Sequence, residues 1–361
     1  MFMRKIFHLS ALICCAMLLE GCAANHCSAV GRAGIYRVSP GKEAVLSLPQ
    51  SGINYLARDK KRNLYYAAAV GKKYGKKRNG AIYVIKYAAN SSMEVVQSVE
   101  IPLRVPAHIA LSPDRKFLYT ANYSRGDVCE FALDELGFIA GKPRIAVHSG
   151  KSVLRRQRSP HPHYCGFDPQ GSQLYVCDLG TDEIWIYDYL PGQGIKLPFR
   201  EKLSLPPGSG PRHMVFDPSG KVFYCANELN SSVSSFVKRN GAWQLAATCP
   251  ALKEGFADKI KNYPGAIKLS CDGKFLLVSN RGHDSIALFA ADGKGALKLL
   301  DTVASGGSYP SDIWLSDNDR QVAAANLKGS SVSWFKLDKV NQRLVPLPEK
   351  HCITQPRALI D

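Results

Sequence analysis

Short runs of alternating apolar and polar residues cover most of this chain after its first 25 residues. These runs are rich in β-branched and aromatic side chains, and segments such as Asp168-Pro-Gln-Gly and Asp217-Pro-Ser-Gly separate them. An alternation of period two that is bounded by Asp, Gly and Pro predicts antiparallel strands. No apolar run after the N-terminus approaches the roughly 20 residues that a membrane-spanning helix needs. The pattern therefore predicts an all-β globular fold.

The alternating runs belong to a repeat that begins at a proline. Six prolines are spaced by 46 to 56 residues: Pro106, Pro162, Pro211, Pro264, Pro310 and Pro356. After each but the last come an apolar run, a turn and a second apolar run, which ends at Asn122, Asp178, Asn227, Asn280 or Asn326. A third run follows in each repeat: Asp127–Phe131, Asp182–Tyr187, Ser232–Phe236, Ser285–Phe289 and Ser331–Phe335. Three or four strands in each roughly 50-residue repeat are typical of β-propeller blades.

Two further copies complete the repeat. One lacks the proline and begins near Ser51, with strands expected at 63–69 and 81–87. The other is split, because Pro356–Asp361 supplies only a first strand and the remaining strands are expected at 27–30, 34–38 and 44–48. The predicted fold is a seven-bladed β-propeller whose ring is closed by pairing the N- and C-terminal strands in one blade, which removes exposed sheet edges.

The first 24 residues have the pattern of an export signal, and the propeller is expected to span 25–361. Arg4 and Lys5 precede an apolar stretch, Ile6–Leu19, and small residues follow it at Gly21-Cys-Ala-Ala24. This order is typical of a secretory signal. Leu19-Glu-Gly-Cys22 resembles a bacterial lipobox, which would make Cys22 the site of lipidation. Cleavage after Ala24 and an uncleaved anchor are the alternatives. Each predicts an exported protein, either periplasmic or attached to the membrane through a lipid anchor.

The eight cysteines after Cys22 show no regular spacing and no CxxC pair. Most of them lie within strand-like runs, where a free cysteine behaves as a small apolar residue. Buried free thiols are the favoured interpretation, although export would also permit disulfides.

The chain carries a surplus of positive charge. It has 361 residues, 47 Lys and Arg against 30 Asp and Glu, and a formal net charge of +17. The surplus is concentrated in Lys60–Arg62, Lys72–Arg78 and Arg155–Arg158. The first two runs are expected to be solvated hairpin tips, or else to attract anionic lipid or cell-wall polymer. The third lies just before His163, where it can steer an anionic substrate. Nucleic-acid binding is not expected, because these runs have no interleaved aromatic residues.

Equivalent positions of the repeat predict a functional site. The residue that begins the inner strand and the residue that follows the second strand should lie on one face, around the mouth of the channel. The residues after the prolines are Ala107, His163, Arg212, Gly265, Ser311 and Arg357, and those after the second strands are Tyr123, Leu179, Glu228, Arg281 and Leu327. Small or apolar residues are tolerated in the same positions, so the charged ones are not needed to build a blade. Unpaired buried charges cost several kcal/mol. A site at His163, Arg212, His213, Glu228 and Arg281 is therefore expected, with a salt-bridge network between blades as the alternative.

Several motifs resemble those of a known family. They are Pro160-His-Pro-His163, Asp178-Leu-Gly-Thr-Asp182, Gly208-Ser-Gly-Pro-Arg-His213, Asn227-Glu-Leu-Asn-Ser-Ser232 and Ser279-Asn-Arg-Gly-His-Asp284. In order and spacing they resemble the bacterial lactonase family of seven-bladed propellers, typified by propeller-type 6-phosphogluconolactonase and related to carboxy-muconate lactonising enzymes. The resemblance covers roughly residues 30–361. It implies that His163, Arg212, Glu228 and Arg281 line the active site, with His161, His213 and His283 as secondary candidates.

One segment departs from the family pattern. At Ser152–Gln157 the run Leu154-Arg155-Arg156 replaces the family's usual Asn-Pro-Glu. Because this segment leads into His163, it is expected to alter substrate preference, with Arg155 as a substrate-binding residue.

These residue types suit the hydrolysis of a lactone by water. Arginines stabilise a developing oxyanion or hold a substrate carboxylate or phosphate, while Glu228 and His163 exchange protons with water and the leaving oxygen. The working hypothesis makes Glu228 the base and His163 its partner. No cofactor or metal is expected, because two arginines would repel a cation. The expected partner is a small lactone or acidic sugar, bound by a monomer. The alternative function is an exported, non-catalytic propeller that binds a ligand or a protein.

Overall fold

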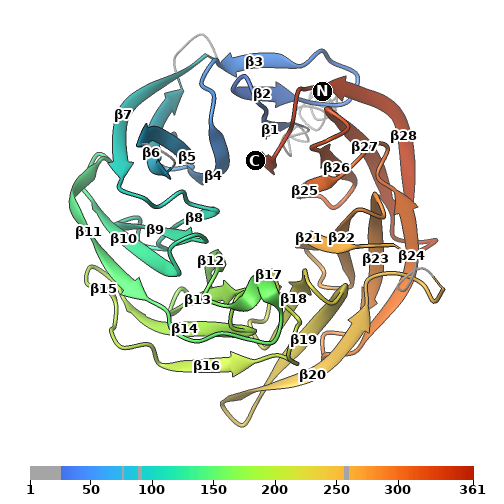
Figure 1. Ribbon diagram of the computed structural model, residues 1–361. Coiled ribbons are helices and arrows are strands. Elements are labelled where there is room, and N and C mark those ends of the chain that lie inside the picture. Colours follow the sequence, from blue (N-terminus) through green and yellow to red (C-terminus); the bar gives the residue numbers. More distant parts are fainter. Residues whose placement is uncertain (1–25, 75–76, 88–91, 256–259) are drawn as a thin grey trace, which may run out of the picture.

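The computed structural model describes residues 26–74, 77–87, 92–255 and 260–361 (Figure 1). The export signal at 1–24, with Cys22, lies outside the described residues. Across these ranges the chain forms strands and one short 3-10 turn, η1 (Arg155–Gln157). A search of the described residues for a helix that is long and apolar enough to cross a membrane found none.

The strands form seven antiparallel sheets, which surround a central channel as blades (Figure 1). The first two blades contain β4 (Ile53–Asp59), β5 (Leu64–Tyr74), β6 (Lys77–Tyr87), β7 (Met93–Ile101), β8 (His108–Leu111), β9 (Phe117–Asn122), β10 (Asp127–Leu133) and β11 (Ile139–Val147). The third contains β12 (Pro162–Phe167), β13 (Gln173–Asp178), β14 (Glu183–Leu190), β15 (Gly194–Ile195) and β16 (Glu201–Ser204). The fourth contains β17 (Pro211–Phe216), β18 (Val222–Asn227), β19 (Ser232–Arg239) and β20 (Ala242–Pro250).

The ring is completed by three more blades. The fifth contains β21 (Tyr263–Leu269), β22 (Phe275–Arg281), β23 (Ser285–Ala291) and β24 (Leu297–Ala304). The sixth contains β25 (Pro310–Leu315), β26 (Gln321–Asn326), β27 (Ser331–Asp338) and β28 (Arg343–Cys352). The seventh has the order β29-β1-β2-β3, with β29 (Ala358–Ile360), β1 (Cys27–Val30), β2 (Ile35–Val38) and β3 (Val45–Leu48).

The split blade is confirmed. Ser28 pairs with Ile360 and Val30 with Ala358, so the C-terminal strand lies innermost in a blade whose other strands come from the start of the chain (Figure 1). The two ends of the described chain therefore close the ring, as the sequence predicts.

The residues that mark the repeat have structural reasons for their places. Pro162, Pro211 and Pro310 each begin an inner strand, where a residue without an N–H group costs the sheet nothing. The polar residue at the end of the second strand is buried, and it forms hydrogen bonds across the next turn to the third strand. Asn227, for example, donates from Nδ2 to the hydroxyls of Ser232 at 2.9 Å and Ser234 at 2.8 Å.

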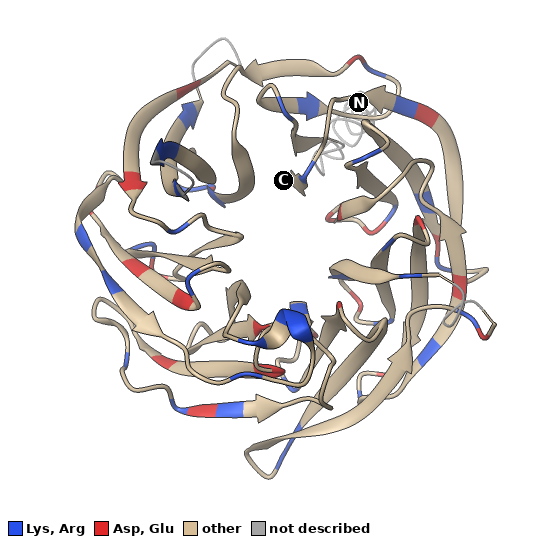
Figure 2. Cartoon of the chain, in the orientation of Figure 1, with Lys and Arg blue, Asp and Glu red and all other residues tan. Residues whose placement is uncertain are grey.

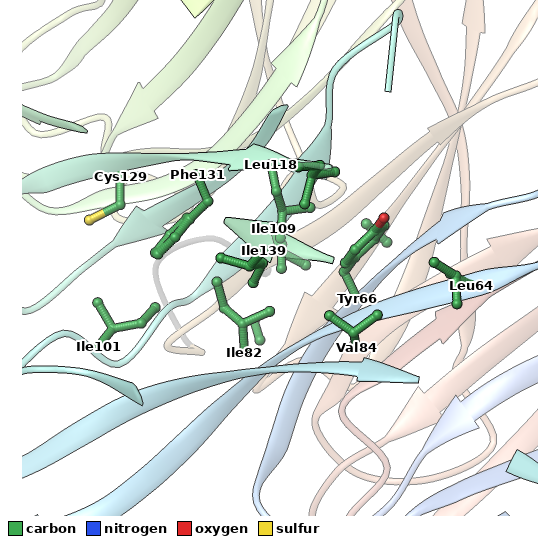
Figure 3. Packing of buried hydrophobic residues seen from close by; sticks show 13 residues of the cluster. Leu64, Tyr66, Ile82, Val84, Ile101, Ile109, Leu118, Cys129, Phe131 and Ile139 are labelled. Carbon is green, nitrogen blue, oxygen red and sulfur yellow. The ribbon is translucent and has the colours of Figure 1, made fainter. Parts of the chain in front are cut away.

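The cores lie between neighbouring blades. In one of them Tyr66 and Ile82 of the first blade contact Ile109, Leu118 and Phe131 of the second, and each is at most 1% exposed (Figure 3). Burial of one such side chain contributes about 1.5–3 kcal/mol. Because each sheet packs on the next, the ring presents a fixed scaffold to whatever lies at its mouth.

All eight cysteines in the described residues are free. Cys27, Cys129, Cys165, Cys177 and Cys225 are buried, as expected of small apolar residues in strands. Cys271 and Cys352 are exposed, so burial does not extend to every thiol.

Candidate functional site

A β-bulge near the start of the inner strand turns the side chain after the proline toward the channel mouth. Pro162 pairs with Asp178 but Tyr164 with Cys177, so His163 is an extra residue between two paired positions. Arg212 occupies the equivalent position in β17, between Pro211 and His213. Such bulges re-aim a side chain locally. Glu228 directly follows β18 and Arg281 ends β22, so both reach the same face.

Glu228 is the centre of an ion-pair cluster. Its carboxylate is 3% exposed and contacts three guanidinium groups. Oε2 lies 2.6 Å from Nη2 of Arg281 and 3.1 Å from Nε of Arg212, and Oε1 lies 2.7 Å from Nη1 of Arg156. One carboxylate therefore faces three guanidinium groups, which leaves a surplus of positive charge for an anionic ligand.

The arginines stabilise the ionised form of Glu228. Burial alone would raise the pKa of Glu228, but Arg281, Arg212, His163 and Arg156 together hold it well below its usual range. Both carboxylate oxygens are also occupied by ion pairs. Glu228 is thus a permanent anion and a weak proton acceptor at neutral pH.

The guanidinium groups are held differently. Arg281 donates from Nε to the carbonyl of Tyr263 at 3.0 Å, and its Nη2 donates to the carbonyl of Pro264 at 3.2 Å. Arg212 is buried, and its Nε and Nη1 donate no aligned hydrogen bond to any described residue. Burial, together with repulsion from Arg281, lowers the pKa of Arg212 to about 10, so it remains charged at neutral pH. Both nitrogens are buried, and Arg212 itself is not part of the cavity lining, so it acts on the site as a buried charge beside Glu228.

His163 faces the same space as a neutral imidazole. Burial and the nearby Arg212 hold the pKa of His163 well below its usual range. Its Nδ1 has no hydrogen-bond partner among the described residues. The ring packs edge-on against His213 at 5.4 Å and Tyr123 at 5.7 Å between ring centroids.

Four of the predicted or newly found site residues, Arg156, His163, Glu228 and Arg281, line a cavity of about 470 Å³ at the channel mouth, whereas Arg212 lies outside its lining. Its lining consists of Tyr123, Arg156, His163, Glu228, Tyr263, Arg281 and Tyr309. The tyrosines supply apolar walls with hydroxyl groups. The charged residues come from the third, fourth and fifth blades, between Tyr123 of the second blade and Tyr309 before the sixth. A cavity of this size and composition can hold a small polar ring that carries or develops negative charge.

The family description "Lactonase, 7-bladed beta-propeller" matches residues 26–360. The chain belongs to this lactonase family. It is 30% identical over 305 residues to a 6-phosphogluconolactonase of Bacillus subtilis. The aligned region covers 84% of this chain and 85% of that protein. It is also 30% identical over 280 residues to a protein of the same name from Formosa agariphila, covering 75% of this chain and 78% of the relative.

Solved structures agree with the family. A periplasmic gluconolactonase of Pseudomonas aeruginosa superposes with a TM-score of 0.82 at 27% identity, covering 92% of this chain and 98% of that one. A protein from Lactobacillus plantarum gives a TM-score of 0.84 at 25% identity, covering 93% and 98%.

Not every residue that the resemblance implies lines the cavity of this lactonase-family chain. His213 lies deeper in the channel, against Tyr164 and His108. His161 stacks on Tyr123 with 4.4 Å between ring centroids, and its Nδ1 lies 2.8 Å from the carbonyl of Tyr123. His283 contacts the hydroxyl of Ser285 at 2.8 Å. None of these three histidines is part of the cavity lining.

The basic segment before His163 contributes a different arginine from the one expected. Arg155 is exposed and is not part of the cavity lining, whereas Arg156 pairs with Glu228 and reaches the hydroxyl of Tyr123 from Nε at 3.3 Å. Figure 2 shows the η1 turn, with its basic ends, above the inner strands beside the channel. Its position over the mouth makes this departure from the family pattern part of the site.

A buried carboxylate fixes the loop that carries Arg156. Asp182 accepts hydrogen bonds from the hydroxyl of Ser152 at 2.6 Å and from Nε2 of Gln157 at 2.7 Å. It also accepts from the N–H groups of Gly208 and Gly210, both at 2.6 Å, in the loop before Arg212. One side chain thus ties together the two loops that deliver Arg156 and Arg212.

The repeat comparison did not single out the aromatic walls. Tyr263 and Tyr309 immediately precede Pro264 and Pro310, so the residue before each proline was an available signal. Tyr309 has a φ of +62°, and its N–H donates a hydrogen bond to Asp284 at 2.7 Å.

Among the described residues, no three His, Cys, Asp or Glu side chains gather closely enough to hold a metal ion.

Proposed function

We propose that this protein hydrolyses a lactone ring, with a sugar lactone as substrate, by direct attack of water. The observation that carries the proposal is the cavity in which a neutral His163 faces arginines clustered on Glu228. The family and the names of its relatives, 6-phosphogluconolactonase and gluconolactonase, support the same class of substrate.

Arginines are the proposed oxyanion and substrate clamp. Attack of water on the lactone carbonyl places negative charge on the carbonyl oxygen. Donors fixed in advance in a water-poor site stabilise that charge most effectively. The anchored guanidinium of Arg281 in the cavity lining suits this task, and the buried Arg212 beside Glu228 adds positive charge. Arg156, which is 46% exposed, is placed to meet a charged group at the outer end of the substrate.

His163 is the proposed proton carrier. It accepts a proton from the attacking water as the new C–O bond forms, and it returns that proton to the ring oxygen as the ring C–O bond breaks. The product is a hydroxy acid, which releases its carboxyl proton to solvent. The sequence hypothesis gave the base role to Glu228, but the three ion pairs at its carboxylate favour His163. The proposed role of Glu228 is to hold the arginines in place and to stabilise the transient imidazolium.

A proton-release assay on a panel of lactones tests the proposal. Wild-type protein is expected to exceed the spontaneous rate on at least one sugar lactone, and Arg212→Ala is expected to lose at least about 10²-fold in turnover. If neither preparation exceeds the spontaneous rate on any lactone, the proposal is overturned. Binding of the corresponding hydroxy acid without turnover would then support the non-catalytic alternative.

We also propose that the protein is exported and anchored through a lipid on Cys22. The signal pattern at 1–24 supports export, as does the similarity to a gluconolactonase named as periplasmic. Palmitate labelling of wild type and of Cys22→Ser tests the anchor. Label on the wild type alone is expected, and equal labelling of both proteins, or of neither, would contradict it.

A further inference from the structure

A second cavity opens on the face that carries the site. It has a volume of about 490 Å³ and lies between the closing blade and the first blade. These two blades lie across the channel from the third to fifth blades (Figure 1). Its lining comes from the start of β4 and the segment before it, the residues after β1, the middle of β5, the start of β6 and the segment before β29. Inner strands start and second strands end on this face, as they do at His163 and Glu228.

Two of its residues occupy the same repeat position as His163 and Arg212. Ile53 pairs with Ala69 but Tyr55 with Ala68, so Asn54 is the bulged residue of its inner strand. Arg357 follows the last proline of the repeat, and its Nη1 lies 3.5 Å from Oδ1 of Asn54. A bulge like those at His163 and Arg212 thus also occurs at Asn54 in the lining of this cavity.

The cavity concentrates positive charge that has no counter-charge. Arg32, Arg78 and Arg357 line it from three separate segments, and no described carboxylate lies within ion-pair distance of any of them. Arg78 belongs to the basic hairpin whose charge the lactonase site does not use. At the other side of the ring, by contrast, Arg212 and Arg281 share Glu228.

The walls leave room for a ligand beside the arginines. Gly52, with a φ of +82°, and Gly31 contribute no side chain to the cavity, and Ser51 and Gln355 add polar groups. Planar guanidinium groups match the oxygens of phosphate and carboxylate in bidentate geometry. An oxyanion is the ligand class that three arginines lining one cavity select.

We propose that this second cavity, formed by Arg32, Arg78, Arg357 and Asn54, binds the phosphate or carboxylate group of a small molecule, separately from the lactonase site. The two cavities share the channel mouth but no residues. The proposal does not depend on lactone hydrolysis.

Arginine modification read out residue by residue tests this proposal. Full-length protein is treated with phenylglyoxal, with and without inorganic phosphate, and each arginine is followed by peptide mass spectrometry. Chloride at matched ionic strength controls for screening. Phosphate is expected to slow modification of Arg32, Arg78 and Arg357 at least about fivefold at occupancies near saturation. Gluconate in place of phosphate shows whether a carboxylate is bound as well.

Variants separate a built site from general charge. Arg357→Gln is expected to abolish the phosphate protection of Arg32 and Arg78. A charge-matched control, Arg320→Gln, alters one exposed residue in the turn before β26 and is expected to leave protection unchanged. Protection no greater than that of Arg239 or Arg320 in the wild type would overturn the proposal. Arginines of the lactonase site report on separate peptides, so a failed lactone assay does not affect this test.

Discussion

At the residue scale, Glu228 has an unusual position for a carboxylate, because three guanidinium groups compete for its two oxygens. Taking charges out of water is costly unless they are paired, and removing one partner leaves the others unpaired. Glu228 therefore contributes both to the free energy of unfolding and to the proposed reaction. These two contributions can be measured separately as functions of pH.

Replacing Glu228 by Gln is expected to lower the free energy of unfolding by about 3–5 kcal/mol at pH 7. The pKa of this carboxyl is depressed in the folded state, so its stabilising contribution is fully present above its ordinary value of 4.5 and is lost as pH falls below that value. Urea unfolding of wild type and E228Q between pH 7 and pH 3 measures the difference. A gap that stays constant below pH 4.5 would contradict the assignment.

The proposed base has its own pH signature. The pKa of His163 lies well below 6.5 because of burial and Arg212, so the imidazole stays neutral as pH falls through 6.5. The kcat/KM of wild type is therefore expected to show no decline between pH 8 and pH 6 after the spontaneous rate is subtracted. A midpoint near 6.5 would instead indicate an unperturbed histidine as the essential base.

Two neighbouring arginines form a matched pair for testing the cavity. Arg156→Ala removes a contact to Glu228 and one to Tyr123, and is expected to lower kcat/KM about tenfold or more, since charge-assisted hydrogen bonds are the strong ones. Arg155→Ala changes the same net charge on the same turn, but Arg155 is outside the cavity lining. Steady-state kinetics that show equal losses in both variants would mean that general charge, rather than contact, is responsible.

At the element scale, the loop before β12 owes its conformation to one side chain. The carboxylate of Asp182 joins this loop to the loop before β17 through four hydrogen bonds. Loops without such a tie are the mobile parts of most proteins. The precision of the Arg156 and Arg212 positions is thus a property of the two loops together.

Asp182→Asn is expected to lower the free energy of unfolding by about 1–3 kcal/mol, because buried donors lose their charged acceptor. Lower kcat with little change in far-ultraviolet circular dichroism would identify Asp182 as a positioning residue. Asp301→Asn, at a half-exposed ion pair with Lys253, is the control and is expected to change neither quantity measurably. Unchanged kcat in Asp182→Asn would contradict the positioning role.

The sequence predicts the elements well because strands repeat a simple physical pattern. The starts of β10, β19, β23 and β27 agree with prediction, since an Asn or Asp and a tight turn precede each. The far ends do not agree: β19 runs to Arg239, beyond the expected Phe236, because exposed outer hairpins carry no apolar signal. The extra strand β16 was not predicted for the same reason.

The site is less predictable than the strands. Positions in the repeat locate His163, Arg212, Glu228 and Arg281, because the fold itself carries them to the mouth. The choice between Arg155 and Arg156 depends on the rotation of a short turn, which hydrogen bonds distant in sequence determine. Sequence spacing does not encode such contacts.

At the scale of the whole molecule, closure of the ring depends on a strand of three residues. β29 pairs with β1 and buries Leu359 and Ala358 in the cores of the neighbouring blades. Without it, the inner edge of β1 would lose its hydrogen-bond partners, and an open edge favours aggregation.

Deleting residues 358–361 is therefore expected to lower the melting temperature and to promote aggregation. Deletion removes two buried apolar side chains, each worth roughly 1–3 kcal/mol, as well as the closing strand pair. Differential scanning fluorimetry with light scattering measures both effects. As a control, deleting 340–342, at the tip of the β27–β28 hairpin, should change neither by much, because the tip contacts no core.

The closing blade also sets the order in which the molecule can be completed. β1 is synthesised before all the residues that separate it from β29, so every blade in between must be made before Ser28 can meet Ile360. Contacts between residues so far apart in sequence form late and slow folding. The middle blades can pack on one another while synthesis continues, whereas β1 waits for its inner partner. A chain interrupted before β29 keeps this edge open, so the ring can close only after that strand has been made.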